Sequence, residues 1–330
     1  MASDLEFKDD GNETMEEELM NGFSVHFDIY PVIVAVLIVI ANATALILIL
    51  RRKKLQTVSN GISASLAVSD ILAGAVGIPL YLACNVTHTP SWCLSSAAFW
   101  RFVSVSTVLH LTILTLHLFA TVVHALRYDS LSRQRVSVCL VCACWVCAAF
   151  VSLIQLSWII YPDDNYYEHK LRVHRIYSIV VMILFLAVPL VTMVYCYTRI
   201  FALVRLYRVE KQAQLRKVRS LNDNQNQTFS NVALKWKVAV VFASMLAVFL
   251  ICWAPYFILE LMEDGETLES LPFWAVYFMF YYTRFTASAI NPVILVLGKR
   301  DFRFALYECL RCCLTSKKNK RARGTIDFLV

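Results

Sequence analysis

The chain alternates between long apolar runs and short polar or charged segments. Crossing a membrane as a helix takes roughly 20 mainly apolar residues, and seven runs reach this length. They lie near residues 30–50, 61–83, 97–123, 136–160, 176–198, 238–261 and 272–297. Because lipid offers the backbone no hydrogen-bond partners, the pattern predicts an all-α bundle of seven transmembrane helices.

The polar segments divide the rest of the chain. We expect an acidic tail over 1–28, the seven-helix domain over 29–298 and a second tail over 314–330. Between the last two, residues 299–313 predict a short amphipathic helix on the membrane surface, because Phe302 and Leu306 recur at helical spacing with basic residues opposite. After the fifth run, basic residues predict a helical extension.

Charge orients this bundle. Lysine and arginine gather in four segments: 51–54, 127–135, 199–219 and 317–323. Cytoplasmic loops carry such an excess, and acidic residues gather on the opposite face, so we expect a multi-pass plasma-membrane protein with an extracellular N-terminus and a cytoplasmic C-terminus. The net charge of +7 is then a topology signal and indicates no nucleic-acid partner.

Composition supports membrane lipids as the surroundings of the chain. Apolar residues make up 58% of the sequence and charged residues only 17%, which is more apolar surface than one water-soluble core can hide. Sequons at Asn12 and Asn85 lie on the predicted outer face and are candidate glycosylation sites. Cys309, Cys312 and Cys313 follow the seventh run beside basic residues, as palmitoylated cysteines do.

Polar residues and prolines inside apolar runs are costly in lipid, so they mark special positions. In chain order these landmarks are Asn42, Leu66-Ala67-Val68-Ser69-Asp70, Trp92-Cys93, Trp145, Pro189, Tyr197, Phe249, Cys252-Trp253-Ala254-Pro255, Asn291-Pro292 and Asp301-Phe302-Arg303. The set resembles the rhodopsin-like (class A) family of G-protein-coupled receptors over about residues 30–313. The resemblance implies a receptor that transmits an extracellular ligand signal to a heterotrimeric G protein by outward movement of the sixth helix.

Asp70, Asn42 and Asn291 resemble the family's mid-membrane polar cluster, which holds a sodium ion in the inactive state. Two interpretations stay open: a sodium site at Asp70, or a satisfied hydrogen-bond network without an ion. Thr107 and Ser288 are available to either, and no other cofactor or metal is expected.

Arg284 lies two helical turns before Asn291 on a similar face, so it could reach Asp70. A buried arginine needs a partner, and we favour a structural Arg284–Asp70 pair. The alternative is that Arg284 points into the ligand region and, with Arg101, binds an acidic ligand group.

Trp253 and Pro255 resemble the family's activation switch, in which proline bends the sixth helix under the ligand. The resemblance makes Phe249, Pro189 and Val108 the packing relay beneath the tryptophan. It adds three further switch residues: Tyr197, Asn291 and Pro292.

The inner end of the third helix departs from the family. Where the family carries Asp-Arg-Tyr, this chain has His117-Leu118-Phe119, and Lys235 replaces the acidic partner on the sixth helix. Leu295 also replaces the usual tyrosine of the seventh helix. Two hypotheses follow: a receptor with altered coupling or high basal activity, or a receptor-like protein that binds or traffics without activating G proteins.

The family's disulfide joins the outer end of the third helix to the second outer loop. Residues 157–174 contain no cysteine. Cys84–Cys93 is then the outer pairing that remains, with its geometry to be decided by the fold.

Ligand chemistry is limited by Trp100, which stands where amine receptors of the family carry an aspartate, and by the lack of a lysine within the seventh run. We therefore expect a small molecule or peptide that is neither a monoamine nor retinal. Eight residues of the outer halves are candidate ligand contacts: Trp100, Arg101, Ser104, Tyr177, Glu260, Tyr281, Tyr282 and Arg284.

Other classes of protein fit the sequence less well. The third helix repeats histidine at every seventh residue, but without a matching carboxylate or thiol set we expect no enzyme. A transporter or channel would carry ionisable residues from face to face. The terminal Phe328-Leu329-Val330 could pair with a PDZ-type domain.

Overall fold

The computed structural model describes residues 25–123, 130–159, 167–217, 237, 239–253, 282–309 and 311. Several sequence predictions fall outside these residues. They are the predictions for Asn12, Lys235, Pro255, Glu260, Tyr281, Cys312, Cys313 and the C-terminal residues 328–330.

The described residues form helices and no strand, which confirms the all-α prediction. The α-helices are α2 Val25–Arg51, α3 Val58–Leu72, α4 Ile78–Thr87, α5 Pro90–Val123, α6 Ser130–Ile154, α7 Leu156–Ile159, α8 Tyr167–Met182, α9 Val188–Lys217 and α13 Thr283–Gly298. Shorter elements are the 3₁₀ turn η1 Lys53–Leu55 and the π-helical segments η2 Ala73–Gly77 and η4 Ile183–Ala187.

Five continuous segments are long and apolar enough to cross a membrane. They are Asp28–Arg51, Val58–Thr87, Pro90–Val123, Gln134–Trp158 and Arg172–Leu206. The shorter apolar helices Ala239–Trp253 and Thr283–Gly298 are the described parts of the sixth and seventh predicted runs. The described part of the first helix, α2, starts at Val25, and Asp28 on it is buried in the bundle.

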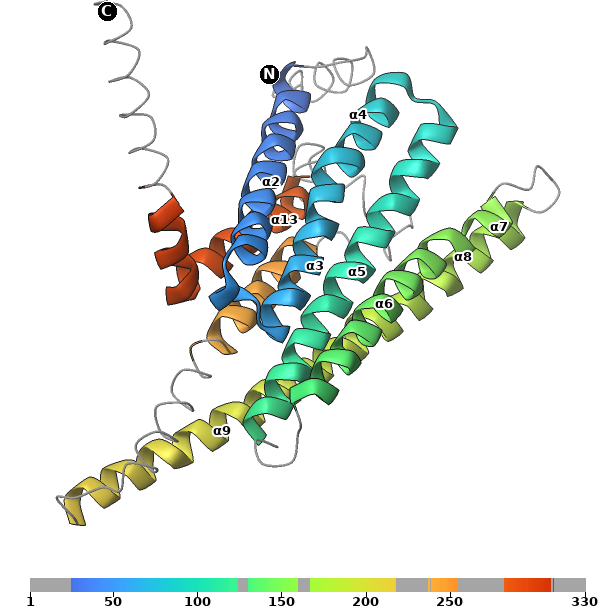
Figure 1. The fold of residues 1–330 in the computed structure, drawn as a ribbon. Coiled ribbons are helices and arrows are strands. Elements are labelled where there is room, and N and C mark those ends of the chain that lie inside the picture. The colour runs from blue at the N-terminus through green and yellow to red at the C-terminus, as the bar shows by residue number, and fades with distance from the viewer. Residues whose placement is uncertain are drawn as a thin grey trace, which may run out of the picture.

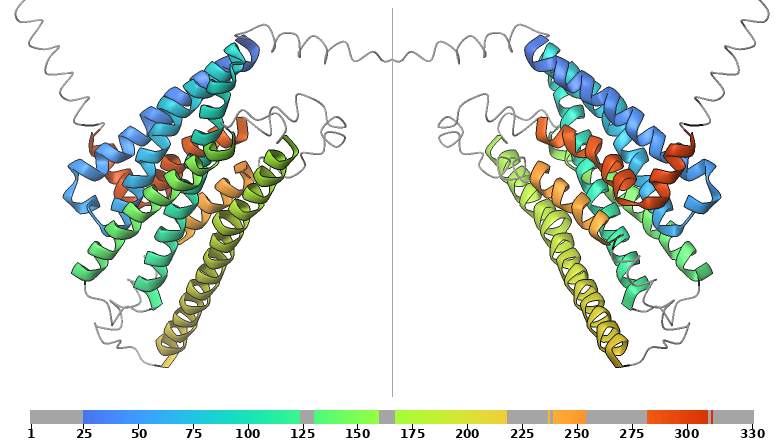
Figure 2. Two further views of the ribbon diagram at one scale, coloured as in Figure 1. Left: turned by 90° about the vertical axis from the view of Figure 1, so that its right-hand side faces the viewer. Right: turned by 90° about the vertical axis from the view of Figure 1, so that its left-hand side faces the viewer.

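Helix α5 is the central element (Figure 1). It packs against α3 and α4 on one side and against α6 and α9 on the other, and it is the most buried of the long helices. Helix α2 packs on α3 and α13, so the first and seventh predicted runs lie side by side (Figures 1 and 2). One hydrophobic core lies between these helices and continues to α9 and the helix 239–253.

Two spans contain π-helical segments, and each ends two residues before a proline. η2 ends at Gly77, ahead of Pro79, and η4 ends at Ala187, ahead of Pro189. Proline removes a backbone donor and its ring clashes with the carbonyl four residues earlier. A wider turn relieves that clash without ending the helix.

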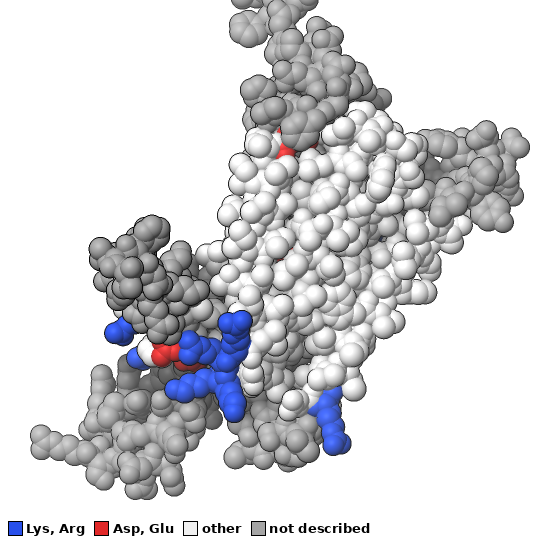
Figure 3. Space-filling model, turned by 45° about the horizontal axis from the view of Figure 1, so that its top comes forward, with Lys and Arg blue, Asp and Glu red and all other residues white. Residues whose placement is uncertain are grey.

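The outer surfaces of the helices are apolar, the inverse of a water-soluble protein. Large hydrophobic side chains are exposed along α2, α6 and α9, among them Ile40, Val146 and Val191. Figure 3 shows a broad face without charged residues, bordered by lysine and arginine at one edge. We call the end that carries Arg51 and Lys54 the basic end, and the end that carries Cys84 and Cys93 the disulfide end.

Two predicted extensions are present in the structure. Helix α9 continues beyond the apolar run to Lys217, as the basic pattern after the fifth run predicted. Residues 300–309 form the predicted amphipathic helix after α13: Phe302 and Ala305 are buried against the bundle, and Arg300 and Arg303 are exposed.

Candidate functional site

A polar network lies in the middle of the bundle, between α2, α3 and α13. Asp70 is fully buried, and its Oδ2 accepts a hydrogen bond of 3.1 Å from Asn291 Nδ2. Asn42 donates through Nδ2 to the carbonyl oxygens of Ile38 and Ser288, each at 3.0 Å. The network therefore ties the first, second and seventh helices together.

The other carboxylate oxygen of Asp70, Oδ1, is buried and has no hydrogen-bond partner among the described residues. The hydroxyl of Ser288 also interacts with this carboxylate, and Thr107 is buried on the neighbouring α5. A carboxylate beside a hydroxyl group offers the oxygen atoms that hard cations prefer. Asp70 and Ser288 therefore fit a sodium ion and would hold it.

Arg284 does not pair with Asp70, so the favoured sequence interpretation was wrong. Its guanidinium carbon lies 4.9 Å from the ring centre of Trp100 and 5.2 Å from that of Phe285. The π electrons of facing aromatic rings partly compensate the charge of a buried cation. Arg284 thus lies on the disulfide side of the polar network, towards the predicted ligand region.

Trp100 connects Arg284 to the predicted switch. Its ring centre lies 6.4 Å from that of Trp253 and 4.7 Å from that of Phe285. Trp253 in turn stacks on Phe249, with ring centres 5.7 Å apart and planes 20° apart. An unbroken aromatic chain therefore leads from Arg284 to Phe249. The relay residues Val108 and Pro189 are buried as well.

Arg101 follows Trp100 in the chain and faces a different neighbour. Its guanidinium carbon lies 5.3 Å from the ring centre of Tyr177 on α8, and Ser104 donates to the Arg101 carbonyl. Tyr177 donates to the carbonyl of Val151. Arg101, Ser104 and Tyr177 thus belong to the interface of α5 with α6 and α8.

Tyr282, at the start of α13, packs towards the first helix. Its ring centre lies 4.4 Å from that of Tyr30, whose hydroxyl is 2.6 Å from Thr286 Oγ1. The predicted ligand contacts therefore separate into a Trp100–Arg284 group, an Arg101–Ser104–Tyr177 group and a Tyr282 contact.

At the basic end, Leu118 is buried and His117 and Phe119 are half-buried, so no charged side chain replaces the family's arginine there. Tyr197, a switch residue by the family resemblance, has its hydroxyl 2.9 Å from Thr115 Oγ1. Leu295 is buried in the core.

Lys299 makes a contact between elements that the sequence did not predict. Its Nζ donates to Asn60 Oδ1 at 2.8 Å and lies 4.6 Å from the ring centre of Phe242 and 5.8 Å from that of Phe302. It thus joins α3, the helix 239–253 and the amphipathic helix. Burial lowers the pKa of Lys299 to about 8, against a smaller opposing effect of Asp301.

The sequence also did not predict a polar cluster around His110. His110 Nε2 lies 2.8 Å from Ser65 Oγ, which accepts a 2.9 Å hydrogen bond from Trp145 Nε1. His110 Nδ1 lies 2.8 Å from the Ser106 carbonyl and 3.3 Å from Cys144 Sγ. The sequence feature that could have indicated this cluster is a histidine, a tryptophan and a serine, each inside a different apolar run.

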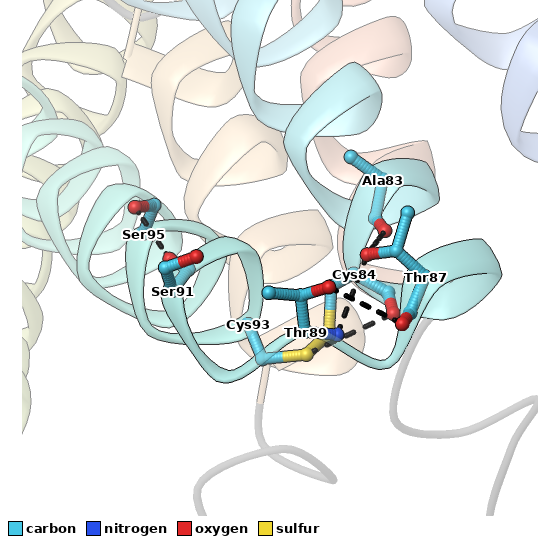
Figure 4. The surroundings of a disulfide bond; sticks show 7 residues. All are labelled: Ala83, Cys84, Thr87, Thr89, Ser91, Cys93 and Ser95. Carbon is cyan, nitrogen blue, oxygen red and sulfur yellow. Dashed lines mark hydrogen bonds between the residues drawn. A yellow bond between two sulfur atoms is a disulfide. The ribbon is translucent and has the colours of Figure 1, made fainter.

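Cys84 and Cys93 form a disulfide that joins the end of α4 to the start of α5 (Figure 4). The turn between them passes through His88 at a φ of 48°. The sequon residue Asn85 lies on the same helix end, and its Nδ2, the atom that would carry a glycan, donates to Asp28 Oδ1 at 2.9 Å. Cys309, half-buried, has a free thiol.

A helical bundle with an apolar outer surface and a buried carboxylate network defines a polytopic membrane protein. Comparison with known families gives its class. Residues 41–295 match the model of the 7 transmembrane receptor (rhodopsin family). The chain therefore belongs to the rhodopsin family of G-protein-coupled receptors and is a seven-helix bundle.

Individual relatives are more distant. The chain is 25% identical to the histamine H2 receptor of Cavia porcellus, over 90% of this chain and 84% of that receptor. The human receptor of the same name is 26% identical, over 87% and 80% of the two chains. The melatonin receptor type 1A of Ovis aries is 28% identical, over 80% and 72%.

Proposed function

We propose that this G-protein-coupled receptor responds to a ligand with an acidic group, which binds at Arg284 and acts on Trp253 through Trp100. We propose further that it lies in the plasma membrane with the disulfide end outside and the basic end in the cytoplasm. Its output then differs from that of receptors in which the arginine of the third helix pairs with an acidic residue of the sixth helix. The observation that carries the proposal is the aromatic chain from Arg284 to Phe249.

The charge of Arg284 favours an acidic ligand over an amine. Two of the relatives are named for histamine and melatonin, but here a tryptophan stands at the position of the amine-binding aspartate. The fixed positive charge of Arg284, 4.9 Å from that tryptophan's ring centre, repels an ammonium group and attracts a carboxylate or phosphate. Binding of such a group would draw the guanidinium away from Trp100 and so change the packing of Trp253.

Residues at the basic end indicate a different restraint on the sixth helix. A buried leucine at Leu118 cannot form the charged contact that restrains the sixth helix in the family. Lys299 supplies a different restraint, because it holds Asn60 on α3 and faces Phe242 on the helix 239–253. We propose that the Lys299 contact takes the place of the family's pair between the third-helix arginine and the sixth-helix acidic residue. A sodium ion at Asp70 would stabilise the same inactive state.

The ligand proposal is tested by thermal stability of the purified full chain with matched aromatic carboxylates and aromatic amines. We expect carboxylates to raise the melting temperature of the natural chain and of Arg284→Lys, but not of Arg284→Gln. Arg101→Gln is the control, since Arg101 faces Tyr177 and should keep the response. Stabilisation by amines, or by carboxylates in Arg284→Gln, would show that Arg284 is not the recognition group.

A second candidate function is binding or trafficking without G-protein activation. The observation that favours it is the loss of every charged group from residues 117–119 except the titratable His117. Measuring basal G-protein activation separates the two, because a non-signalling protein gives the activity of empty membranes.

A further inference from the structure

The basic end holds a cavity of about 1010 Å³. Its walls are the link between α2 and α3, Lys237, and the helix after α13. Eight basic residues line it: Arg51, Arg52, Lys53, Lys54, Lys237, Lys299, Arg300 and Arg303. Among the described residues of its lining, two are acidic, Asp301 and Glu308. Figure 3 shows lysine and arginine side chains gathered at this edge, around a few acidic atoms.

The first wall of the cavity is held in place by internal contacts. Leu55 is buried and anchors η1, so that Lys53 and Lys54 are presented outward. Gln56 Nε2 donates to the Leu50 carbonyl and Asn60 Nδ2 to the Leu55 carbonyl, each at 2.8 Å. The two lysines therefore project from a fixed turn, which reduces the ordering cost of binding an anion.

The second wall is joined to the first by an ion pair. Arg52 Nη1 lies 2.8 Å from Glu308 Oε2. This pair uses one of the two acidic residues, so the remaining side chains leave a strong positive potential in the cavity. A multiply charged anion gains more from that potential than a singly charged one.

An apolar stripe on the outside of α2 leads directly to the cavity. Its exposed side chains recur at helical spacing: Ile33, Val36, Leu37, Ile40, Ile47 and Leu50. The last of them is 63% exposed and precedes Arg51, the first residue of the cavity wall. A molecule with acyl chains and an anionic head would contact both features at once.

We propose that this cavity binds the multiply phosphorylated headgroup of a phosphoinositide whose acyl chains lie along the α2 stripe. The proposal rests on the orientation given above, which places the basic end at the inner leaflet, where such lipids reside. A free inositol phosphate shares the headgroup chemistry but lacks the chains. The stripe therefore favours the lipid.

The test measures binding of three probes to the full chain in neutral detergent: short-chain phosphatidylinositol bisphosphate, the matching soluble inositol trisphosphate and short-chain phosphatidylserine. We expect the phosphoinositide to bind tightest. Lys54→Gln with Arg303→Gln removes one exposed charge from each wall and should weaken its binding about 25-fold, at about fivefold per basic residue. Leu50→Asn should weaken the lipid but not the inositol phosphate.

Matched controls carry the same changes away from the cavity. The controls are the double variant Arg135→Gln with Arg205→Gln and the single variant Leu206→Asn. Both alter exposed residues that do not line the cavity and should leave the affinity unchanged. Equal loss in both double variants would reduce the effect to net charge and overturn the proposal. So would equal affinity for phosphatidylserine or for the soluble phosphate. The assay contains no G protein or agonist, so a chain that does not signal still gives a clear result.

Discussion

Single residues set the energetic terms of this bundle, and Asp70 is the most demanding of them. A carboxylate buried between helices is costly unless it is paired or coordinated. Asn291 satisfies Oδ2, while Oδ1 has no hydrogen-bond partner within the described part of the chain. A sodium ion would supply the positive charge that Arg284, stacked on Trp100, does not bring to this site.

We expect replacement of sodium by N-methylglucamine to lower the melting temperature of the purified receptor. At sodium about tenfold above its dissociation constant, the stabilisation is about 1.4 kcal/mol. Asp70→Asn should abolish the sodium response. Asp28→Asn alters another buried carboxylate, which accepts from Asn85, and should retain the response. A response that survives in Asp70→Asn would place the ion elsewhere.

At the scale of elements, the helices were predictable and their partners were not. Apolar runs gave the spans, and spacing gave the extension of α9 and the amphipathic helix at 300–309, because both depend on local periodicity. The positions of Arg284 and Lys299 depend on which side chains of distant helices surround them. Sequence spacing allowed Arg284 to reach Asp70, but the Trp100 and Phe285 rings hold it instead. The His110 cluster likewise needs three helices to be placed.

Lys299 gives the contact between elements a measurable pH dependence. Its pKa is lowered by burial from 10.5 to about 8. The unfolded chain therefore binds more protons between these two pH values, and stability rises with pH across that window. We expect the melting temperature of the natural chain to rise relative to that of Lys299→Met between pH 8 and pH 10.

The control for this experiment is Lys53→Met, which removes an exposed lysine of the same end. It should keep the pH dependence of the natural chain. A parallel pH profile for the natural chain and Lys299→Met would mean that Lys299 is solvated and does not hold the helices together.

For the whole molecule, the two ends and the middle differ in how closely they follow the family. The middle retains Asp70, Asn291 and Trp253 in contact with neighbouring helices. The disulfide end closes its own turn with Cys84 and Cys93. At the basic end, a buried leucine stands at the position of the family's arginine, and Lys299 and the basic cavity lie beside α3 and the helix after α13. We therefore propose a receptor whose middle keeps the family's residues and whose output has a different restraint.

The most direct measurement of that account is basal activation of a panel of G proteins by the full chain in reconstituted vesicles. We predict activity above that of empty vesicles with at least one G protein, and a changed preference or level in Leu118→Arg. Leu116→Arg, at an exposed position two residues away, is the matched control and should behave as the natural chain does. Activity equal to empty vesicles with every G protein would contradict a signalling receptor and favour the binding or trafficking function.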